Sequence, residues 1–368
     1  MAASPKLREA TFADYEQIIA LESGQNLRAR SREEWSRLWL DNPVYKQLRK
    51  TWPIGWVLED QDRRIVGTIG NVPLTYVFEG RELLVAAGRA WAVEERFRSM
   101  ALLLMDTYFS QSNFDLFLNT TVNSQAAEAF AVFGSSPVPA GDWTAASYWV
   151  THYPGFAKTA LLVKKLPLPH LLCYPAGACL YAKDLATSRR LPRAPRDIEV
   201  RRTNRFDERF DAFWTALAGR RNILLGLRSR EVLEWHFGAS LQQDDVWVFT
   251  VSTGDSLRAY AIFQRRDEPR TGLKRIRLVD FQALSRQADC LRAIMAEALK
   301  AARRNGIHIV EKVGLKIEDT LLLDEYAPYR RKLDAWPFYF HAPDRALQEA
   351  LQLPASWQPS SFDGDASL

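Results

Sequence analysis

The stretch Arg89–Gly134, RAWAVEERFRSMALLLMDTYFSQSNFDLFLNTTVNSQAAEAFAVFG, decides the fold of this chain. It predicts a strand over 90–93, a helix over 100–109, a second strand over 116–122 and a second helix that begins at Asn123. Strand, helix, strand and helix within about 45 residues is the pattern of a crossover unit with parallel strands.

A spaced motif lies in the second half of this stretch. Asn123 is followed by Ala126 three residues on, by Phe130 four further on and by Gly134 after another four. This spacing resembles the last acyl-CoA-binding motif of the GCN5-related N-acetyltransferase (GNAT) superfamily. In that family the turn before the first helix reads Arg/Gln-x-x-Gly-x-Gly/Ala. The aligned segment here is Arg98–Leu103, RSMALL, so both glycines are replaced.

The resemblance implies a role for this turn. In the family its backbone amides hold the pyrophosphate of CoA, because N–H groups at a helix N-terminus bind an anion without a charged side chain. By position, the amides of residues 99–103 would face the pyrophosphate, Asn123 the pantetheine arm or the strand end, and the amide of Val93 the thioester oxygen. Ala101 can still present its amide, whereas Leu103 places a side chain where the phosphates would approach. The residues assigned to acyl-CoA in this way are Ala92, Val93, Arg98, Ser99, Met100, Ala101, Leu102, Leu103, Asn123, Ala126 and Phe130.

The order of elements repeats in the second half of the chain. The tetrapeptide RSRE precedes a Trp-bearing helix at residues 30–33 and again at 228–231. Three strands, a helix and a further strand follow in both halves, at an offset of about 190 to 198 residues, which indicates an internal duplication. The predicted fold class is α/β (α+β), with two tandem GNAT-like domains that each have a mixed, mostly antiparallel sheet flanked by helices.

The predicted domains follow from this repeat. Residues 1–152 form the GNAT-like domain that holds acyl-CoA, in which Thr11 and Asp14 cap the first helix and 145–151 is the closing strand. Residues 197–368 form a second, degenerate GNAT-like domain on the acceptor side, whose last eight residues are expected to be mobile.

A basic segment rich in proline, residues 153–196, separates the two predicted domains. One interpretation is a peripheral membrane contact, with apolar residues towards the lipid and basic residues towards its phosphates. The other is a helical linker packed between the domains, in which Pro167, Pro169 and Pro175 prevent any long helix.

Composition places the chain among ordinary globular proteins. It has 368 residues, 47% hydrophobic and 25% charged, with a net charge of +5. Three separated cysteines and the lack of an apolar leader or of a long apolar run predict a cytoplasmic protein that is at most peripheral to the membrane. The five histidines lack ligand spacing, so no metal is expected.

The chemistry that the resemblance implies needs a neutral amine, a donor to the oxyanion and a base. Family members often have Tyr in place of Phe130, which cannot donate a proton, but a thiol of pKa about 8.5 can leave as thiolate. Arg89 stands where relatives often have a carboxylate. Asp280 and Glu311 are the candidate catalytic bases, since a carboxylate in an apolar strand can have a raised pKa. The alternative for each is a paired structural acid.

The resemblance predicts an N-acyltransferase that uses acetyl-CoA or another acyl-CoA as co-substrate. The acceptor would be a small-molecule amine, such as an amino sugar or an amino acid, held between the two domains as in several tandem relatives. Two alternatives stay open: a Fem-like transferase that takes its acyl group from aminoacyl-tRNA, and a non-catalytic protein that kept the fold. The sequence does not specify the oligomeric state.

Overall fold

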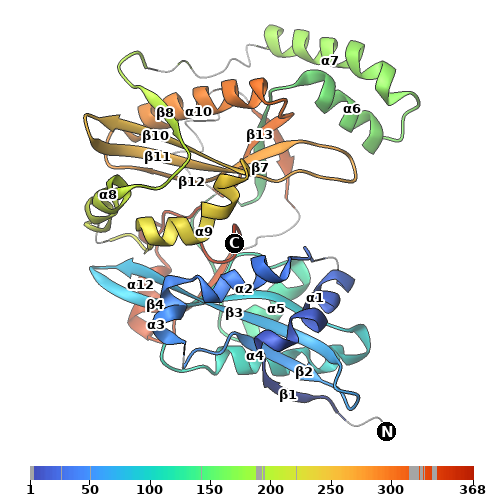
Figure 1. Cartoon of the computed structure of the whole chain (residues 1–368), viewed down its shortest axis with the longest axis vertical. Helices are drawn as coiled ribbons and strands as arrows, with labels where there is room; N and C mark the ends of the chain where they lie inside the picture. The colour runs from blue at the N-terminus through green and yellow to red at the C-terminus, as the bar shows by residue number, and fades with distance from the viewer. Residues whose placement is uncertain are drawn as a thin grey trace.

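The structure is a computed structural model of the chain. It describes residues 4–25, 27–49, 51–141, 143–187, 193, 195–220, 222–314, 323, 326, 328–333 and 338–368. Two β-sheets lie one above the other along the long axis of the molecule, and helices flank each of them (Figure 1). This arrangement confirms the predicted fold class.

The first sheet is built mainly by the N-terminal half. Its first four strands are antiparallel, and the fifth is parallel to the fourth. The strands are β1 (Lys6–Glu9), β2 (Gly55–Glu59), β3 (Ile65–Phe78), β4 (Arg81–Val93) and β5 (Leu116–Asn119). The helices are α1 (Tyr15–Gly24), α2 (Arg32–Leu40), α3 (Pro43–Leu48), α4 (Ala101–Phe109) and α5 (Ser124–Val132). The predicted crossover unit is therefore confirmed, with its second strand ending earlier, at Asn119.

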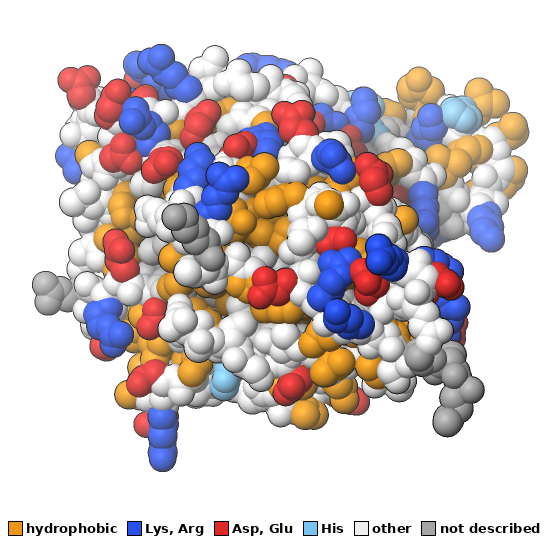
Figure 2. All heavy atoms as spheres, turned by 60° about the horizontal axis from the view of Figure 1, so that its bottom comes forward, with side chains coloured by type: hydrophobic (Ala, Val, Ile, Leu, Met, Phe, Trp, Pro, Cys, Tyr) orange, Lys and Arg blue, Asp and Glu red, His pale blue; other side chains and the backbone are white. Residues whose placement is uncertain are grey.

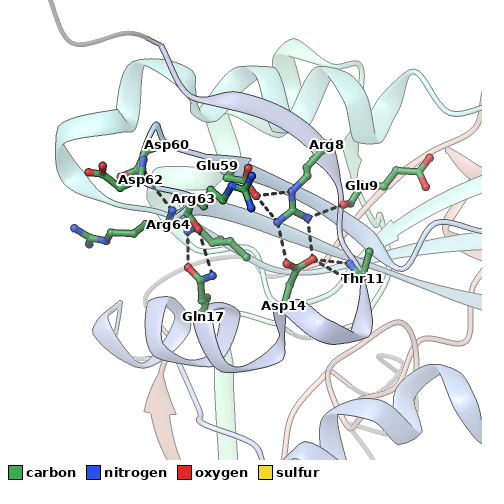
Figure 3. Close-up of polar contacts among 11 residues, drawn as sticks. Arg8, Glu9, Thr11, Asp14, Gln17, Glu59, Asp60, Asp62, Arg63 and Arg64 are labelled. Carbon is green, nitrogen blue, oxygen red and sulfur yellow. Dashed lines mark hydrogen bonds and ion pairs between the residues drawn. The ribbon is translucent and has the colours of Figure 1, made fainter.

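A polar network holds the start of this sheet together (Figure 3). Arg8 of β1 donates from Nε to Glu59 Oε2 on β2 at 2.7 Å and from Nη1 to Asp14 Oδ2 at 2.8 Å. Asp14 also accepts the backbone N–H of Thr11 at 2.8 Å, which makes the predicted cap before α1.

The second sheet repeats this topology. Its strands are β8 (Val200–Thr203), β10 (Val246–Thr253), β11 (Ser256–Arg265), β12 (Arg275–Ala283) and β13 (Ile309–Lys312). The first four are antiparallel and β13 is parallel to β12. Its helices are α8 (Glu208–Ala218), α9 (Arg230–Gln242) and α10 (Gln287–Arg304). The two RSRE tetrapeptides have the same structural role, because the serine of each, Ser31 or Ser229, is the N-cap of the helix that follows, α2 or α9.

The two halves exchange strands. β7 (Ala145–Val150) pairs with β13 of the second sheet, so the prediction that 145–151 closes the first sheet is wrong. In return, β15 (Tyr339–His341) pairs with β5 of the first sheet. Two outer strands flank the exchanged ones, β6 (Ser136–Pro137) beside β15 and β14 (Tyr329–Lys332) beside β7. The domain ranges 1–152 and 197–368 stay a prediction, and the sheets do not follow them strictly.

The C-terminal segment, residues 358–368, is largely buried and lies between the two sheets, where the label C stands in Figure 1. It bonds to both sheets: Tyr76 Oη on β3 donates to Asp363 Oδ1 at 3.0 Å, and Ser360 Oγ donates to Asp280 Oδ1 on β12 at 3.2 Å. The prediction that the last eight residues are mobile is therefore wrong, because their polar groups have buried partners.

The basic segment forms a helical hairpin of α6 (Tyr153–Val163) and α7 (Pro169–Ala186), and residues 188–192 and 194 lie outside the described part of the chain. The prediction that proline prevents a long helix is wrong. Pro169 lies in the first turn of α7, where no intrahelical donor is needed, and the exposed Pro175 lies inside the helix. The hairpin projects beside the second sheet, away from the first, so it is not packed between domains (Figure 1).

Candidate active site

A small cavity lies where β4 and β5 part. The two strands pair only from Val85 to Ala87 of β4. Just beyond, Ala90 has φ of 50°, and the register between β3 and β4 shifts at the same place. A bulge with a non-glycine residue in the left-handed region is strained, and such bulges re-aim the backbone next to functional sites. The β4–β5 cavity has a volume of about 90 Å³ and is lined by Leu27, Ile69, Gly88, Arg89, Ala90, Trp91, Asn119, Thr121, Val122, Asn123, Ala126 and Phe130.

The spaced motif forms one wall of this cavity. Asn123 is the N-cap of α5, and its Oδ1 accepts the N–H of Ala126 at 2.8 Å. Phe130, one turn further on, is buried and meets Trp91 edge to face with ring centroids 6.3 Å apart. The structure therefore brings Asn123, Ala126 and Phe130 together, with Trp91 as an aromatic partner that the sequence analysis did not single out.

The turn assigned to pyrophosphate is a 3₁₀ helix, η2 (Glu95–Met100), that runs into α4. The amide of Ala101 donates to the carbonyl of Arg98, so the prediction that Ala101 presents a free amide is wrong. The Leu102 and Leu103 side chains are exposed to solvent and do not line the β4–β5 cavity. The other contacts assigned to residues 98–103 stay predictions.

Two further assigned residues lie next to the cavity. Ala92 and Val93 pair with β3 opposite Thr68 and Gly67, and they lie outside the cavity lining. The lining of β4 is formed instead by the four residues 88–91, around the bulge. The bulge was not predictable, because alanine gives no sequence signal for a positive φ.

A buried ion pair lies against the cavity. Arg89 Nη1 is 3.7 Å from Oε1 of Glu22 on α1, and the two side chains are 7% and 2% exposed. Burial raises the pKa of Glu22, and the charges of Arg89 and Arg30 oppose this shift. Among the described residues, Glu22 Oε2 has no hydrogen-bond partner. The sequence analysis missed Glu22, although an acid beside Ile18 and Leu21 on the apolar face of a helix was a usable signal.

A second carboxylate reaches the same place from the C-terminal segment. Asp365 accepts hydrogen bonds from Thr120 Oγ1 at 2.8 Å and from Thr121 Oγ1 at 3.2 Å. Burial raises the pKa of Asp365, and the Thr120 hydrogen bond and the charge of Arg89 oppose this shift. Thr121 also lines the β4–β5 cavity, so Asp365 lies one side chain behind the cavity wall. The sequence analysis missed Asp365 because it treated the segment as mobile.

A larger cavity separates the two halves. This inter-sheet cavity has a volume of about 360 Å³, within the range of small-molecule sites. Trp235 Nε1 on α9 donates to the carbonyl of Arg37 on α2 at 2.8 Å and so ties its two sides together. His236 Nε2 is 2.8 Å from Ser367 Oγ, and burial lowers the pKa of His236 to about 3. The lining is Arg28, Arg30, Ser31, Glu33, Glu34, Arg37, Leu38, Trp235, His236, Ala239, Ser240, Gln243, Gln264, Ser367 and Leu368.

Arginines crowd one side of this region. Arg28 and Arg30 line the inter-sheet cavity. Arg266 comes directly after the end of β11, two residues after the lining residue Gln264. Burial lowers the pKa of Arg266 to about 10, and the nearby charges of Arg277, Arg28, Arg30 and Arg275 act in the same direction. The cluster therefore carries an excess of positive charge.

Glu311, one of the two candidate bases, belongs to this cluster. It accepts hydrogen bonds from Arg277 Nη2 at 2.9 Å and from Arg331 Nη2 at 2.8 Å. Burial acts to raise its pKa, but the charges of Arg277 and Arg275 outweigh burial and lower it. The prediction of a raised pKa is wrong for Glu311, and the alternative of a paired acid describes it.

Asp280, the other candidate base, is fully buried in an ion pair with Arg228. The bonds are 2.9 Å from Nε to Oδ2 and 3.1 Å from Nη2 to Oδ1, and Tyr260 Oη donates to Oδ2 at 2.9 Å. Burial acts to raise the pKa of Asp280, but Arg228 outweighs it and lowers the pKa. The raised pKa predicted for Asp280 is therefore wrong too.

No protein-family model matches the sequence, and no curated protein sequence matches it either. The structure, in contrast, is similar to solved acyltransferases. One is the Saccharomyces cerevisiae N-myristoyltransferase with bound myristoyl-CoA, at a TM-score of 0.57 and 12% identity over 93% of this chain and 80% of that one.

Two bacterial structures show the same likeness. A GCN5-related N-acetyltransferase from Anabaena variabilis matches at a TM-score of 0.53 and 11% identity, over 92% of this chain and 73% of that one. A conserved protein of unknown function from Enterococcus faecalis, described as a probable N-acyltransferase, matches at a TM-score of 0.56 and 8% identity, over 92% of this chain and 72% of that one. This chain therefore has the two-sheet GNAT fold that these proteins share.

Proposed function

We propose that this protein is an N-acyltransferase that moves an acyl group from acyl-CoA to a small amine bound in the inter-sheet cavity. The observation that carries the proposal is the β4–β5 cavity, formed at a strained bulge and walled by the Asn123, Ala126 and Phe130 motif. The structural neighbours support acyl transfer in general, and one of them binds myristoyl-CoA. Fold likeness alone does not establish an activity, so the site carries the argument.

In this proposal the β4–β5 cavity holds the thioester end of acyl-CoA, with Trp91 and Phe130 around its apolar part. The amine attacks the thioester carbonyl, so that a C–N bond forms and the C–S bond breaks. Backbone N–H groups at the Ala90 bulge are the proposed donors to the oxyanion. CoA leaves as a thiolate, because a thiol of pKa about 8.5 needs no acid near neutral pH.

The attacking amine must lose a proton, and we assign its uptake to Asp365. A carboxyl of raised pKa suits a general base, and Asp365 has one, whereas Asp280 and Glu311 have lowered pKa values. Asp365 also bonds to Thr121 of the cavity wall at 3.2 Å. Glu22 shares the raised pKa, but its neighbour Arg89 holds it in an ion pair.

The charge of the inter-sheet cavity favours an acceptor with an anionic group. Arg28 and Arg30 line it, and the crowded Arg266 adds to the positive potential. Glu33 and Glu34 line the same cavity and offset part of this charge. The Glu34 oxygens already accept from Arg28 at 3.5 Å and from the N–H of Ser31 at 2.9 Å, and Arg30 also donates to the carbonyl of Leu368. A carboxylate bound to guanidinium groups would relieve the repulsion, which favours an amino acid over an amino sugar.

Isothermal titration with acetyl-CoA and longer acyl-CoAs tests the donor site. We expect binding of at least one of them, and a loss of about tenfold or more in affinity for Ala126→Phe, which fills the cavity. Val132→Phe, on the exposed side of the same helix, is the matched control. If neither acetyl-CoA nor a longer acyl-CoA binds the wild-type protein, the proposal fails.

The acceptor is tested separately, by the release of free CoA with pairs of amino acids and their carboxamides. We expect turnover with an amino acid and a clearly higher KM for its carboxamide, which lacks the charge. Equal KM values for the two members of every pair would contradict an anionic acceptor and leave the donor site unaffected.

A further inference from the structure

The α6–α7 hairpin exposes an unusual amount of apolar surface. Its turn, residues 162–168 with the sequence LVKKLPL, is exposed throughout. The large apolar side chains of the hairpin that reach 39% to 68% exposure are Leu162, Val163, Leu166, Leu168, Leu171, Leu172, Tyr174, Tyr181 and Leu185. Soluble surfaces rarely gather so many apolar side chains on one short unit, and such a patch marks an interaction site.

These residues form a continuous stripe along α7. Leu171, Tyr174, Tyr181 and Leu185 are exposed, and their spacing with the exposed Ala178 is three, four, three and four residues. This is the spacing of one helix face. The opposite face, with Cys173, is buried against the protein. The apolar stripe is therefore the outer face of the helix, where a protein in water would normally place polar residues.

The charges of the hairpin are almost all positive. Lys164 and Lys165 lie in the exposed turn and Lys183 lies on α7, also exposed. Asp184 is the only acid among residues 153–187, and it is buried, where it accepts hydrogen bonds from Tyr153 Oη at 2.9 Å and from Tyr329 Oη. The outer surface of the described hairpin thus offers lysines and no carboxylate. Figure 2 shows hydrophobic side chains with Lys and Arg beside them at the upper right, where the hairpin projects.

The two helices of the hairpin pack closely against each other. A side chain at Gly177 of α7 would lie 2.9 Å from the backbone nitrogen of Pro154 in α6, so only glycine allows this approach. Tyr153 and Asp184 add a hydrogen bond between the same two helices. The stripe is therefore fixed in place by packing between the helices.

We propose that the α6–α7 hairpin docks the protein on an anionic membrane surface, with its turn and outer stripe among the lipid chains and its lysines at the headgroups. None of the described helices is long and apolar enough to cross a bilayer, so the hairpin lies in the interface. Tyrosines such as Tyr174 and Tyr181 suit that depth, because they are apolar with a polar end.

A second copy of the chain fits this surface less well. A two-fold dimer pairs a patch with itself, so it would cover Lys164 and Lys165 of both copies in an interface to which neither hairpin brings an exposed carboxylate. Anionic lipid headgroups neutralise the same lysines, at roughly 1 kcal/mol for each. The inference does not depend on the proposed acyl transfer, since the hairpin lies outside both cavities.

Co-sedimentation of the full-length protein with lipid vesicles tests the proposal. We expect binding to vesicles of phosphatidylglycerol and phosphatidylcholine, little binding to phosphatidylcholine alone, and release by high salt. The double variant Val163→Ser with Leu171→Ser, and the double variant Lys164→Glu with Lys165→Glu, should each bind about tenfold more weakly or worse. Leu353→Ser, an exposed leucine elsewhere, is the control and should bind as the wild type does.

Two results would overturn the membrane proposal. The first is a wild-type protein that stays in the supernatant with anionic vesicles. The second is a dimer by light scattering that the Val163→Ser, Leu171→Ser variant converts to a monomer while vesicle binding is unaffected, which assigns the stripe to a second copy. Circular dichroism checks that both double variants remain folded.

Discussion

Arg89 of β4 and Asp280 of β12 occupy equivalent positions in the two sheets and carry opposite charges. Each lies two residues beyond the last residue pair of its parallel strands. Asp280 meets Arg228 in a closed ion pair. Arg89 lies near Arg30 instead, and the two positive charges depend on carboxylates from α1 and from the C-terminal segment. In the second sheet this position therefore makes a structural ion pair. In the first sheet Arg89 lies beside a cavity, near carboxylates of raised pKa.

Asp280→Ala should destabilise the protein strongly. Removing the carboxylate leaves Arg228 buried without its partner, and breaking a buried ion pair costs about 3–5 kcal/mol. Chemical denaturation measures the loss. The double variant Arg228→Met with Asp280→Leu removes both charges and should recover most of it. A single variant as stable as the wild type would refute the structural role of Asp280.

Asp365→Asn should abolish most of the acyl transfer while acyl-CoA binding stays unchanged. The amide cannot accept the amine proton, and the loss of a general base lowers kcat by roughly 10²–10⁴-fold. The wild-type rate should also fall as the pH drops through the raised pKa of Asp365, because only the ionised carboxylate accepts a proton. Steady-state kinetics over a pH range measures both effects. Asp365→Glu serves as the conservative variant, and an Asp365→Asn protein with wild-type kcat would remove the residue from the proposed mechanism.

Asn123→Ala should lower the stability of the first half by about 1 kcal/mol through the lost N-cap of α5. Asn123→Ser keeps a capping oxygen and should remain close to the wild type in thermal unfolding. If the alanine variant is also defective in acyl-CoA binding at a temperature where it is folded, Asn123 has a second role at the cavity.

His236 should make the protein acid-sensitive. Burial lowers its folded-state pKa to about 3, from an ordinary value of 6.5. As the pH falls below 6.5, the unfolded chain takes up a proton that the folded protein does not, so the free energy of unfolding falls. The contribution is complete above pH 6.5 and is lost progressively towards pH 3.

Urea denaturation at several pH values between about 7 and 4.5 checks this, through the slope of the unfolding free energy against pH. His236→Gln should have a shallower slope than the wild type. His170→Gln, on the exposed face of α7, is the control and should share the wild-type slope. Parallel slopes for all three proteins would contradict the lowered pKa of His236 in the folded protein.

The sequence predicted those features that depend on local spacing. The crossover unit, the cap by Thr11 and Asp14 and the repeat of the first half in the second all follow from sequence patterns, and the structure has them. Asn123, Ala126 and Phe130 meet at one cavity because one helix carries all three residues.

The features that the sequence did not reveal depend on contacts between distant residues. A strand pattern such as 145–150 does not say which sheet the strand joins, and β7 joined the far one. The pKa of a carboxylate depends on neighbours from other elements: arginines lower it at Glu311, and burial raises it at Asp365. Proline was misjudged for another reason: inside a helix it costs a hydrogen bond and a steric clash but does not forbid the helix, and α7 continues through the exposed Pro175.

The exchange of β7 and β15 has a consequence for biosynthesis. During translation the first sheet lacks β15, its neighbour at β5, until residues 339–341 have left the ribosome. The edge of the first sheet at β5 therefore stays unpaired until nearly all of the polypeptide is made. A nascent chain that stalls or is cleaved before that point exposes this edge to aggregation and to chaperones.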